Sequence, residues 1–322
     1  MINFWKKINI DSVKSFVRRI SFFGGIRLWV TVISLTFVGS TILVNTGQLV
    51  QISFDRLTFM WLALAVFPSF VGLVINAIAW KNLLFWLGYR PNNFGLISLY
   101  LSSNLLKYLP GGIWHFVERL RVLKSHVGAG KALVSVLLEP LLMISAALLY
   151  VPFGGWKSGI AFFCILPAVC LLKRFREPLI RRLESLKAGQ LKKIFLASQI
   201  SDGTNNLLID RDDYPFRVLV LEMLFVLFRF FGFWLCLYAF SIQSSATFLE
   251  WLAAFSLAWS IGLVVPGAPG GVGVFEASIL IVLGPAVQES SLVVVLLCYR
   301  LVSTIVDLLA GLLVSLRKII TL

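Results

Sequence analysis

Six charged residues stand inside stretches of the chain that are otherwise apolar. They are Glu139, Glu222, Arg229, Glu276, Arg300 and Asp307. A charged side chain at the centre of a bilayer costs about 2.5–3.5 kcal/mol on an insertion scale, so each one needs a partner or a function. Glu222 and Arg229 are seven residues apart, as are Arg300 and Asp307, and this spacing places both members of a pair on one helix face. We expect these faces to point into a helix bundle, where the charges either form structural ion pairs or bind a ligand.

A Pro-Gly-Gly sequence occurs twice, each time where an apolar stretch is interrupted. One copy, PGGIWHFVE, begins at Pro110, and the other, PGGVGVFE, begins at Pro269. Each has a Phe six residues after the Pro, followed closely by a Glu, which is Glu118 in the first copy and Glu276 in the second. The similarity predicts an internal repeat. A broken helix at membrane depth is tolerated only where protein covers it or water fills a cavity, as in transporters that bind a substrate at the midplane.

The two breaks predict a binding site for an anion. A helix that restarts after each Gly pair points unpaired N–H groups at the break, an arrangement that suits a phosphate or a carboxylate. Basic residues nearby would add positive charge, and the two Glu residues would hold a cation or a substrate amine. His115 follows Trp114 and is either a hydrogen-bonded packing residue or a proton carrier. The predicted substrate-binding residues are Lys107, Gly111, Gly112, His115, Glu118, Arg119, Gly270, Gly271, Glu276 and Arg300. Four further intramembrane charges are predicted to have either a functional role or a structural one as ion pairs; they are Glu139, Glu222, Arg229 and Asp307.

The composition is that of an integral membrane protein. Of the 322 residues, 59% are hydrophobic and only 14% are charged, against about 25% charged in soluble domains. The net charge of +14 would suit nucleic acid only if the basic residues were gathered on a soluble face, and no segment could fold as such a domain. Two His residues without a surrounding acidic cluster, and no phosphate-binding loop, predict no metal, no cofactor and no catalytic residue. The four Cys residues lie singly in apolar stretches and are expected to be buried.

Apolar segments of about 20 residues predict the membrane spans. Six are expected, at 28–44, 57–80, 131–151, 158–172, 217–240 and 291–316, and two further segments run into the Pro-Gly-Gly breaks. Lys and Arg number 24 in segments 1–27, 81–92, 119–131, 173–217 and 317–318, whereas the remaining linkers carry only Arg56 and Lys157. Because basic loops stay in the cytoplasm, this count predicts cytoplasmic N- and C-termini and two re-entrant hairpins that enter from opposite faces.

The predicted fold is an all-α polytopic membrane protein of about six spans plus two broken-helix hairpins in an inverted repeat. Residues 1–27 alternate basic and apolar side chains, which is typical of a helix lying on an anionic membrane surface. The first membrane half is 28–172 with a hairpin at about 94–127, and 173–216 is a basic cytoplasmic linker. The second half is 217–322 with a hairpin at about 247–284. We expect a multi-pass protein of the cell membrane.

Four stretches together resemble the lysylphosphatidylglycerol synthase transmembrane family. They are NLLKYLPGGIWHFVERL, SVLLEPLLMISA, VPGAPGGVGVFEASILIVLG and LLCYRLVSTIVDLLAGLL. The resemblance covers about residues 30–316 and implies a helical bundle that moves a phospholipid, in the best-understood members a lysylated one, between leaflets. The chain is expected to be a stand-alone member without the soluble synthase domain, so lysylation of a lipid is not carried over.

The function expected from these observations is that of a lipid transporter, or flippase, for a phospholipid or a lipid-linked headgroup. A membrane-embedded enzyme that modifies lipids or glycolipids is an alternative, and a non-catalytic subunit of envelope lipid synthesis is another. The expected partners are the lipid substrate and the membrane, with a second copy of the chain or a lipid-synthesis enzyme as further candidates, and no nucleic acid.

Overall fold

The computed structural model is helical throughout the part of the chain that it describes. This part comprises residues 54–89, 95–108, 114–155, 160–175, 178, 213–242, 244–265, 273–287 and 289–320. Four helices in it are long and apolar enough to cross a bilayer: α3 (Arg56–Trp86), α6 (Ala129–Leu148, continued by η3, Val151–Gly154), α9 (Phe216–Ala239) and α12 (Glu289–Ile320). The protein is an all-α polytopic membrane protein, which confirms the predicted fold class.

Shorter helices flank the two Pro-Gly-Gly breaks. The first break lies between α4 (Leu96–Asn104), extended by η2 (Leu105–Tyr108), and α5 (Trp114–Val127). The second lies between α10 (Phe248–Val264) and α11 (Val274–Leu283), which is followed by η5 (Gly284–Ala286). In each case the helices on the two sides of the break contact each other.

Some predicted segments lie outside the described residues, and one corresponds to a shorter helix than expected. The expected span 28–44, the surface segment 1–27 and most of the linker 173–216 lie outside the described residues. The expected span 158–172 corresponds to α7 (Ile160–Val169), whose 10 residues are too few to cross a bilayer by themselves.

Local sequence determines where several helices begin. The Asp55 carboxylate accepts from the Thr58 amide at 2.7 Å and from its hydroxyl at 2.6 Å, which caps α3 and holds the pKa of Asp55 below its usual value. Thr247 and Glu250 form a reciprocal capping box at the start of α10. Gly273, at φ +84°, precedes α11 in a left-handed conformation that glycine adopts without strain.

The centre of the bundle is the crossing of α3 and α9. A Cβ atom on Gly232 would lie 2.0 Å from the Ser69 hydroxyl oxygen, and one on Gly72 would lie 3.2 Å from the Phe228 Cβ. Later residues of α9 thus face earlier residues of α3, so the two helices run antiparallel. The glycines allow close backbone approach, which is a common basis of helix packing in membranes.

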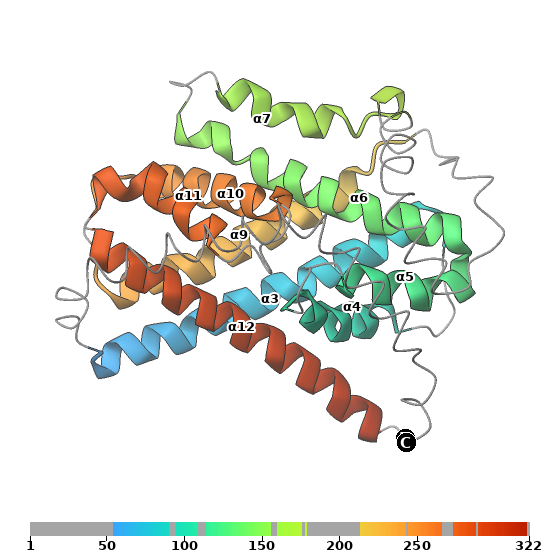
Figure 1. Cartoon of the computed structure of the whole chain (residues 1–322), viewed down its shortest axis with the longest axis horizontal. Coiled ribbons are helices and arrows are strands. Elements are labelled where there is room, and N and C mark those ends of the chain that lie inside the picture. Colours follow the sequence, from blue (N-terminus) through green and yellow to red (C-terminus); the bar gives the residue numbers. More distant parts are fainter. Residues whose placement is uncertain are drawn as a thin grey trace, which may run out of the picture.

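The other helices surround this crossing in a reciprocal pattern. Helix α6 contacts α9 and α10, while α12 contacts α3 and α4. Figure 1 shows α4 and α5 toward the right-hand end of the molecule and α10 and α11 toward the left-hand end. Exchanging α3, α4, α5 and α6 with α9, α10, α11 and α12 therefore reproduces the same set of contacts.

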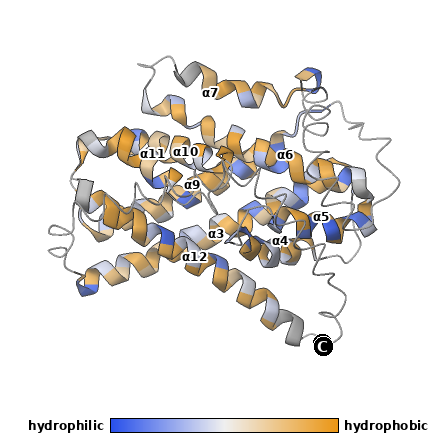
Figure 2. Ribbon diagram, in the orientation of Figure 1, coloured by the Kyte–Doolittle hydropathy of each residue, from blue (hydrophilic) through white to orange (hydrophobic). Residues whose placement is uncertain are grey.

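Apolar side chains cover the outer surface of the long helices. Figure 2 shows mostly hydrophobic residues along α7 and along the half of α12 nearest the C-terminus. The exposed residues of α12 include Leu301, Ile305, Leu308, Leu312 and Leu316. A continuous exposed apolar face of this kind suits lipid chains rather than water.

Candidate functional site

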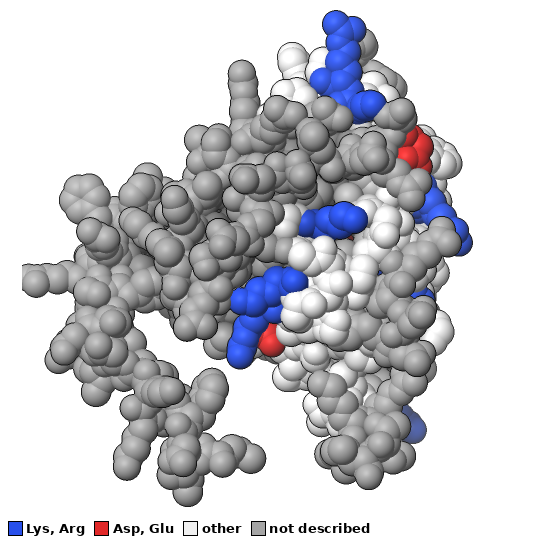
Figure 3. Space-filling model, turned by 90° about the vertical axis from the view of Figure 1, so that its right-hand side faces the viewer, with Lys and Arg blue, Asp and Glu red and all other residues white. Residues whose placement is uncertain are grey.

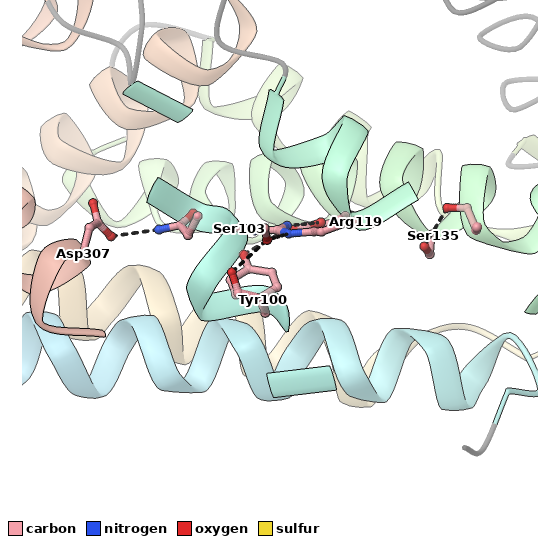
Figure 4. A network of polar contacts seen from close by, with 8 residues as sticks. Tyr100, Ser103, Arg119, Ser135 and Asp307 are labelled. Carbon is pink, nitrogen blue, oxygen red and sulfur yellow. Dashed lines mark hydrogen bonds and ion pairs between the residues drawn. The ribbon is translucent and has the colours of Figure 1, made fainter. Parts of the chain in front are cut away.

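The first of two buried charged clusters is centred on Asp307 of α12. The Lys107 ammonium lies 2.7 Å from Asp307 Oδ2, and the Tyr108 hydroxyl donates to the same oxygen at 2.6 Å. The Asn104 amide donates to Oδ1 at 2.8 Å. Because all three partners come from the end of α4 and from η2, Asp307 ties α12 to the segment that leads into the first break (Figure 4).

Two arginines complete this cluster. Arg229 of α9 is 8% exposed and lies within electrostatic range of Asp307 and of the Tyr299 hydroxyl. Its Nε and Nη1 have no hydrogen-bond partner among the described residues. Arg300 of α12 pairs with Glu276, and both arginines are close enough to Lys107 to repel its charge. We call Lys107, Arg229, Arg300, Glu276 and Asp307 the cation cluster, since three cations there face two carboxylates.

Glu276 connects the cation cluster to the second break. Its Oε2 accepts from the backbone N–H of Gly273 at 2.7 Å, and its Oε1 accepts from Arg300 Nε. The carboxylate thus stabilises the first turn of α11 directly after the break, while Arg300, packed 5.2 Å from the Phe275 ring, neutralises it. The start of α11 is thereby attached to α12.

The second cluster is centred on Arg119 of α5. Its Nη1 donates to both oxygens of Glu139 on α6, at 2.7 and 2.9 Å, and its Nε donates to Ser103 at 2.9 Å. The Tyr100 hydroxyl donates to Glu139 at 2.8 Å, and the Tyr100 ring lies 3.6 Å from the guanidinium carbon (Figure 4). Glu222 of α9 is 1% exposed and interacts electrostatically with both Glu139 and Arg119. We call Arg119, Glu139 and Glu222 the arginine–carboxylate cluster.

The two clusters have opposite surplus charges. Three cations and two carboxylates make the cation cluster positive when all are ionised, whereas one arginine and two carboxylates make the arginine–carboxylate cluster negative. Glu222 and Arg229, seven residues apart on α9, lie about 10 Å apart along the helix axis. The two clusters therefore lie at different levels along α9.

The structure brings together only some of the predicted site residues. Lys107, Glu276 and Arg300 meet in the cation cluster, and Arg119 lies in the other cluster. Glu118 is instead a partly exposed residue that faces Arg121 at 3.7 Å. The His115 ring lies tilted against the Phe116 ring with centroids 3.8 Å apart, and its Nδ1 has no hydrogen-bond partner among the described residues. Gly111, Gly112, Gly270 and Gly271 lie outside the described residues.

The intramembrane charges find their partners on other helices. Spacing along one helix suggested Glu222 with Arg229 and Arg300 with Asp307, but Asp307 binds Lys107 and Arg300 binds Glu276. Sequence reasoning also missed Tyr100, Ser103, Asn104 and Tyr108. These polar side chains occur just before the first break, where their alternation with leucine could have indicated a polar lining.

The arrangement of these charged groups is suited to binding an ion. Within the described residues, no group of three or more His, Cys, Asp or Glu could hold a metal ion. Arg229 Nε and Nη1, which have no partner among the described residues, can donate to an anion, because a buried donor without an acceptor costs about 1–3 kcal/mol.

Comparison with known proteins agrees with this membrane architecture. A search among curated proteins gives no match. The family model described as the lysylphosphatidylglycerol synthase TM region matches residues 26–311, a range that contains both breaks and both clusters. The chain therefore belongs to the family of the lysylphosphatidylglycerol synthase transmembrane region.

Proposed function

We propose that the protein moves a phospholipid or a lipid-linked headgroup between leaflets and binds its phosphate at the cation cluster. The observation that carries the proposal is Arg229, a buried guanidinium near the middle of α9 whose Nε and Nη1 have no partner in the described part of the chain. Lys107 and Arg300 supply further positive charge, Lys107 just before the first break and Arg300 paired with Glu276 just after the second. Membership of a family named for a lipid synthase supports a lipid as the molecule bound.

The proposed architecture is an inverted repeat with two re-entrant hairpins. Its support is the reciprocal set of contacts around the antiparallel α3 and α9, together with the short helices beside each break. Hairpins that enter from opposite faces bring two irregular segments to the membrane midplane, where a polar headgroup needs protection from the lipid chains. We place the protein in the cell membrane with both termini in the cytoplasm, on the basis of its charge distribution.

The anion site is tested by substituting Arg229 with Gln and with Lys. The purified variants are reconstituted into liposomes, and leaflet-to-leaflet movement of fluorescent phospholipids is measured. Arg229→Gln should slow movement about tenfold or more, because a hydrogen bond to a charged group contributes about 1.5–3 kcal/mol. Arg229→Lys should retain part of the rate, since it preserves the charge without the fork of donors.

Arg121→Gln is the matched control, since Arg121 is exposed and lies outside both clusters. Its rate should equal that of the unsubstituted protein. Arg229→Gln that folds normally and moves lipid at the original rate would exclude the cation cluster as the headgroup site. Mass spectrometry of the same liposomes would reveal a modified lipid if the protein were an enzyme instead.

A further inference from the structure

Arg119 and Glu222 have complementary atoms that no described residue satisfies. Arg119 uses Nη1 for Glu139 and Nε for Ser103, but its Nη2 has no partner. Glu222 likewise has an Oε2 atom without a partner. Both residues are 1% exposed, so bulk water does not supply the missing hydrogen bonds. The guanidinium thus binds one carboxylate of α6 while a second carboxylate, from α9, stands nearby with a free acceptor.

The charges around Glu222 leave one negative charge uncompensated. Glu139 of α6, Arg119 of α5 and the Tyr100 hydroxyl of α4 face it. The other helices packed against α9 carry further charged residues. Arg300 and Asp307 of α12 are paired in the cation cluster. The rest lie near helix ends; they are Arg56 and Lys81 of α3, Lys131 of α6, Glu250 of α10, and Glu289, Arg317 and Lys318 of α12. Because an unpaired carboxylate in a low-dielectric interior is far less stable than the neutral acid, Glu222 must hold a proton here.

We propose that Glu139 and Glu222 form a proton-binding site in which one proton and Arg119 are shared between two carboxyl groups. In the arrangement described, Glu139 is ionised and bound to Arg119, and Glu222 is the neutral acid. When α5 shifts so that Arg119 Nη2 donates to Glu222, the O–H bond of Glu222 breaks. Its proton goes to Glu139, or to water if that group then pairs elsewhere.

This exchange couples proton position to the position of the first hairpin. Arg119 is on α5, the limb that follows the first break, while the two carboxyl groups are on spans that hold the bundle together. A proton gradient could therefore bias the hairpin between two positions. The coupling to lipid movement rests on the proposed function, whereas the proton site itself does not.

The test is infrared spectroscopy of the purified full chain in detergent, which detects the carbonyl stretch of a buried protonated carboxylic acid. The unsubstituted protein should show this band at neutral pH, and Glu222→Gln should lose it. Glu139→Gln should lose it as well, although Glu222 remains, because Glu222 then ionises to compensate Arg119. The matched control Glu118→Gln, a partly exposed residue of α5, should keep the band.

Thermal unfolding of the same proteins gives a second readout. Each single substitution should be tolerated, since one carboxylate still neutralises Arg119, while the double variant should melt well below both singles. A fixed ion pair predicts the opposite pattern, in which Glu139→Gln alone is unstable and Glu222→Gln changes nothing. That pattern, or a carboxylic acid band that persists in Glu222→Gln, would overturn the proposal. If the two substitutions remove the band as expected but the unsubstituted protein does not move lipid, the transport function is rejected and the proton site is still supported.

Discussion

At the scale of single residues, Asp307 holds the most heavily used carboxylate among the described residues. It accepts from Lys107, Tyr108 and Asn104 and also lies within electrostatic range of Arg229. Its side chain is fully buried, whereas that of Lys107 is 21% exposed. Removing the charge of Asp307 therefore disturbs the cluster more than removing the charge of Lys107. Without Lys107, Asp307 still has Arg229 nearby, but without Asp307 neither Lys107 nor Arg229 has another unpaired carboxylate nearby in the described part of the chain.

This asymmetry predicts different stabilities for two substitutions. Asp307→Asn should lower the free energy of unfolding by about 3 kcal/mol, because it leaves Lys107 and Arg229 uncompensated in the interior. Lys107→Met should cost clearly less, since Arg229 still neutralises the aspartate. Thermal melting in detergent measures both, and combining Lys107→Met with Asp307→Asn should restore part of the loss. Equal destabilisation by the two single substitutions would contradict the assignment of Arg229 to this cluster.

At the scale of elements, the helix after each break is tied to the next span by one ion pair with the signs exchanged. Arg119 of α5 binds Glu139 of α6, and Glu276 of α11 binds Arg300 of α12. Both helices also pack by apolar side chains, Leu120 and Leu123 of α5 in one core cluster and Phe275 and Ile279 of α11 in the other. The ion pair therefore adds a polar attachment to an apolar one.

The crossing of α3 and α9 makes a prediction about helix packing. Gly232→Ala would place a methyl group 2.0 Å from the Ser69 hydroxyl oxygen and 3.2 Å from the Ala65 carbonyl oxygen. The Ser69 hydroxyl must then turn away and the two helices must give way slightly at the Ala65 carbonyl, which should cost about 1–3 kcal/mol as overpacking does elsewhere. Melting temperatures provide the measurement, and Ser69→Gly in the same chain should recover most of the loss by vacating that space. Unchanged stability of Gly232→Ala would mean that the two helices do not approach this closely.

The sequence predicted most of the described helices but not which charged residues pair between them. Hydropathy and the Pro-Gly-Gly breaks predicted α3, α6, α9, α12 and the paired short helices, because those signals are local. Spacing on one helix could not show that Asp307 binds Lys107, a residue 200 positions earlier, since that contact depends on how the two halves pack. Glu118 and Arg119 are adjacent in sequence, yet one is partly exposed and the other buried, because successive residues of a helix face different directions.

At the scale of the whole molecule, the short helices beside the two breaks lie toward opposite ends of the described chain, on either side of the antiparallel α3 and α9 (Figure 1). Figure 3 shows Lys and Arg side chains with little acidic surface on the right-hand end face, where α5 lies. Exposed basic residues of α5 and α6 include Arg121 and Lys131. An end rich in basic residues is expected to face the cytoplasm.

This arrangement predicts opposite labelling of two exposed serines in intact cells. Ser125 lies on α5 and Ser245 lies in the loop before α10, so the proposed topology places the first in the cytoplasm and the second outside. With the four native cysteines replaced, Ser245→Cys should react with a membrane-impermeant maleimide added to cells, whereas Ser125→Cys should react only after permeabilisation. Each cysteine should react in permeabilised cells, which controls for burial. Because α6, α7 and α9 separate the two positions, labelling of both from the same side would mean that these three helices do not all cross the membrane. Reversed labelling, with Ser125→Cys reactive from outside, would mean that the first hairpin crosses the membrane, and the inverted repeat would have to be abandoned.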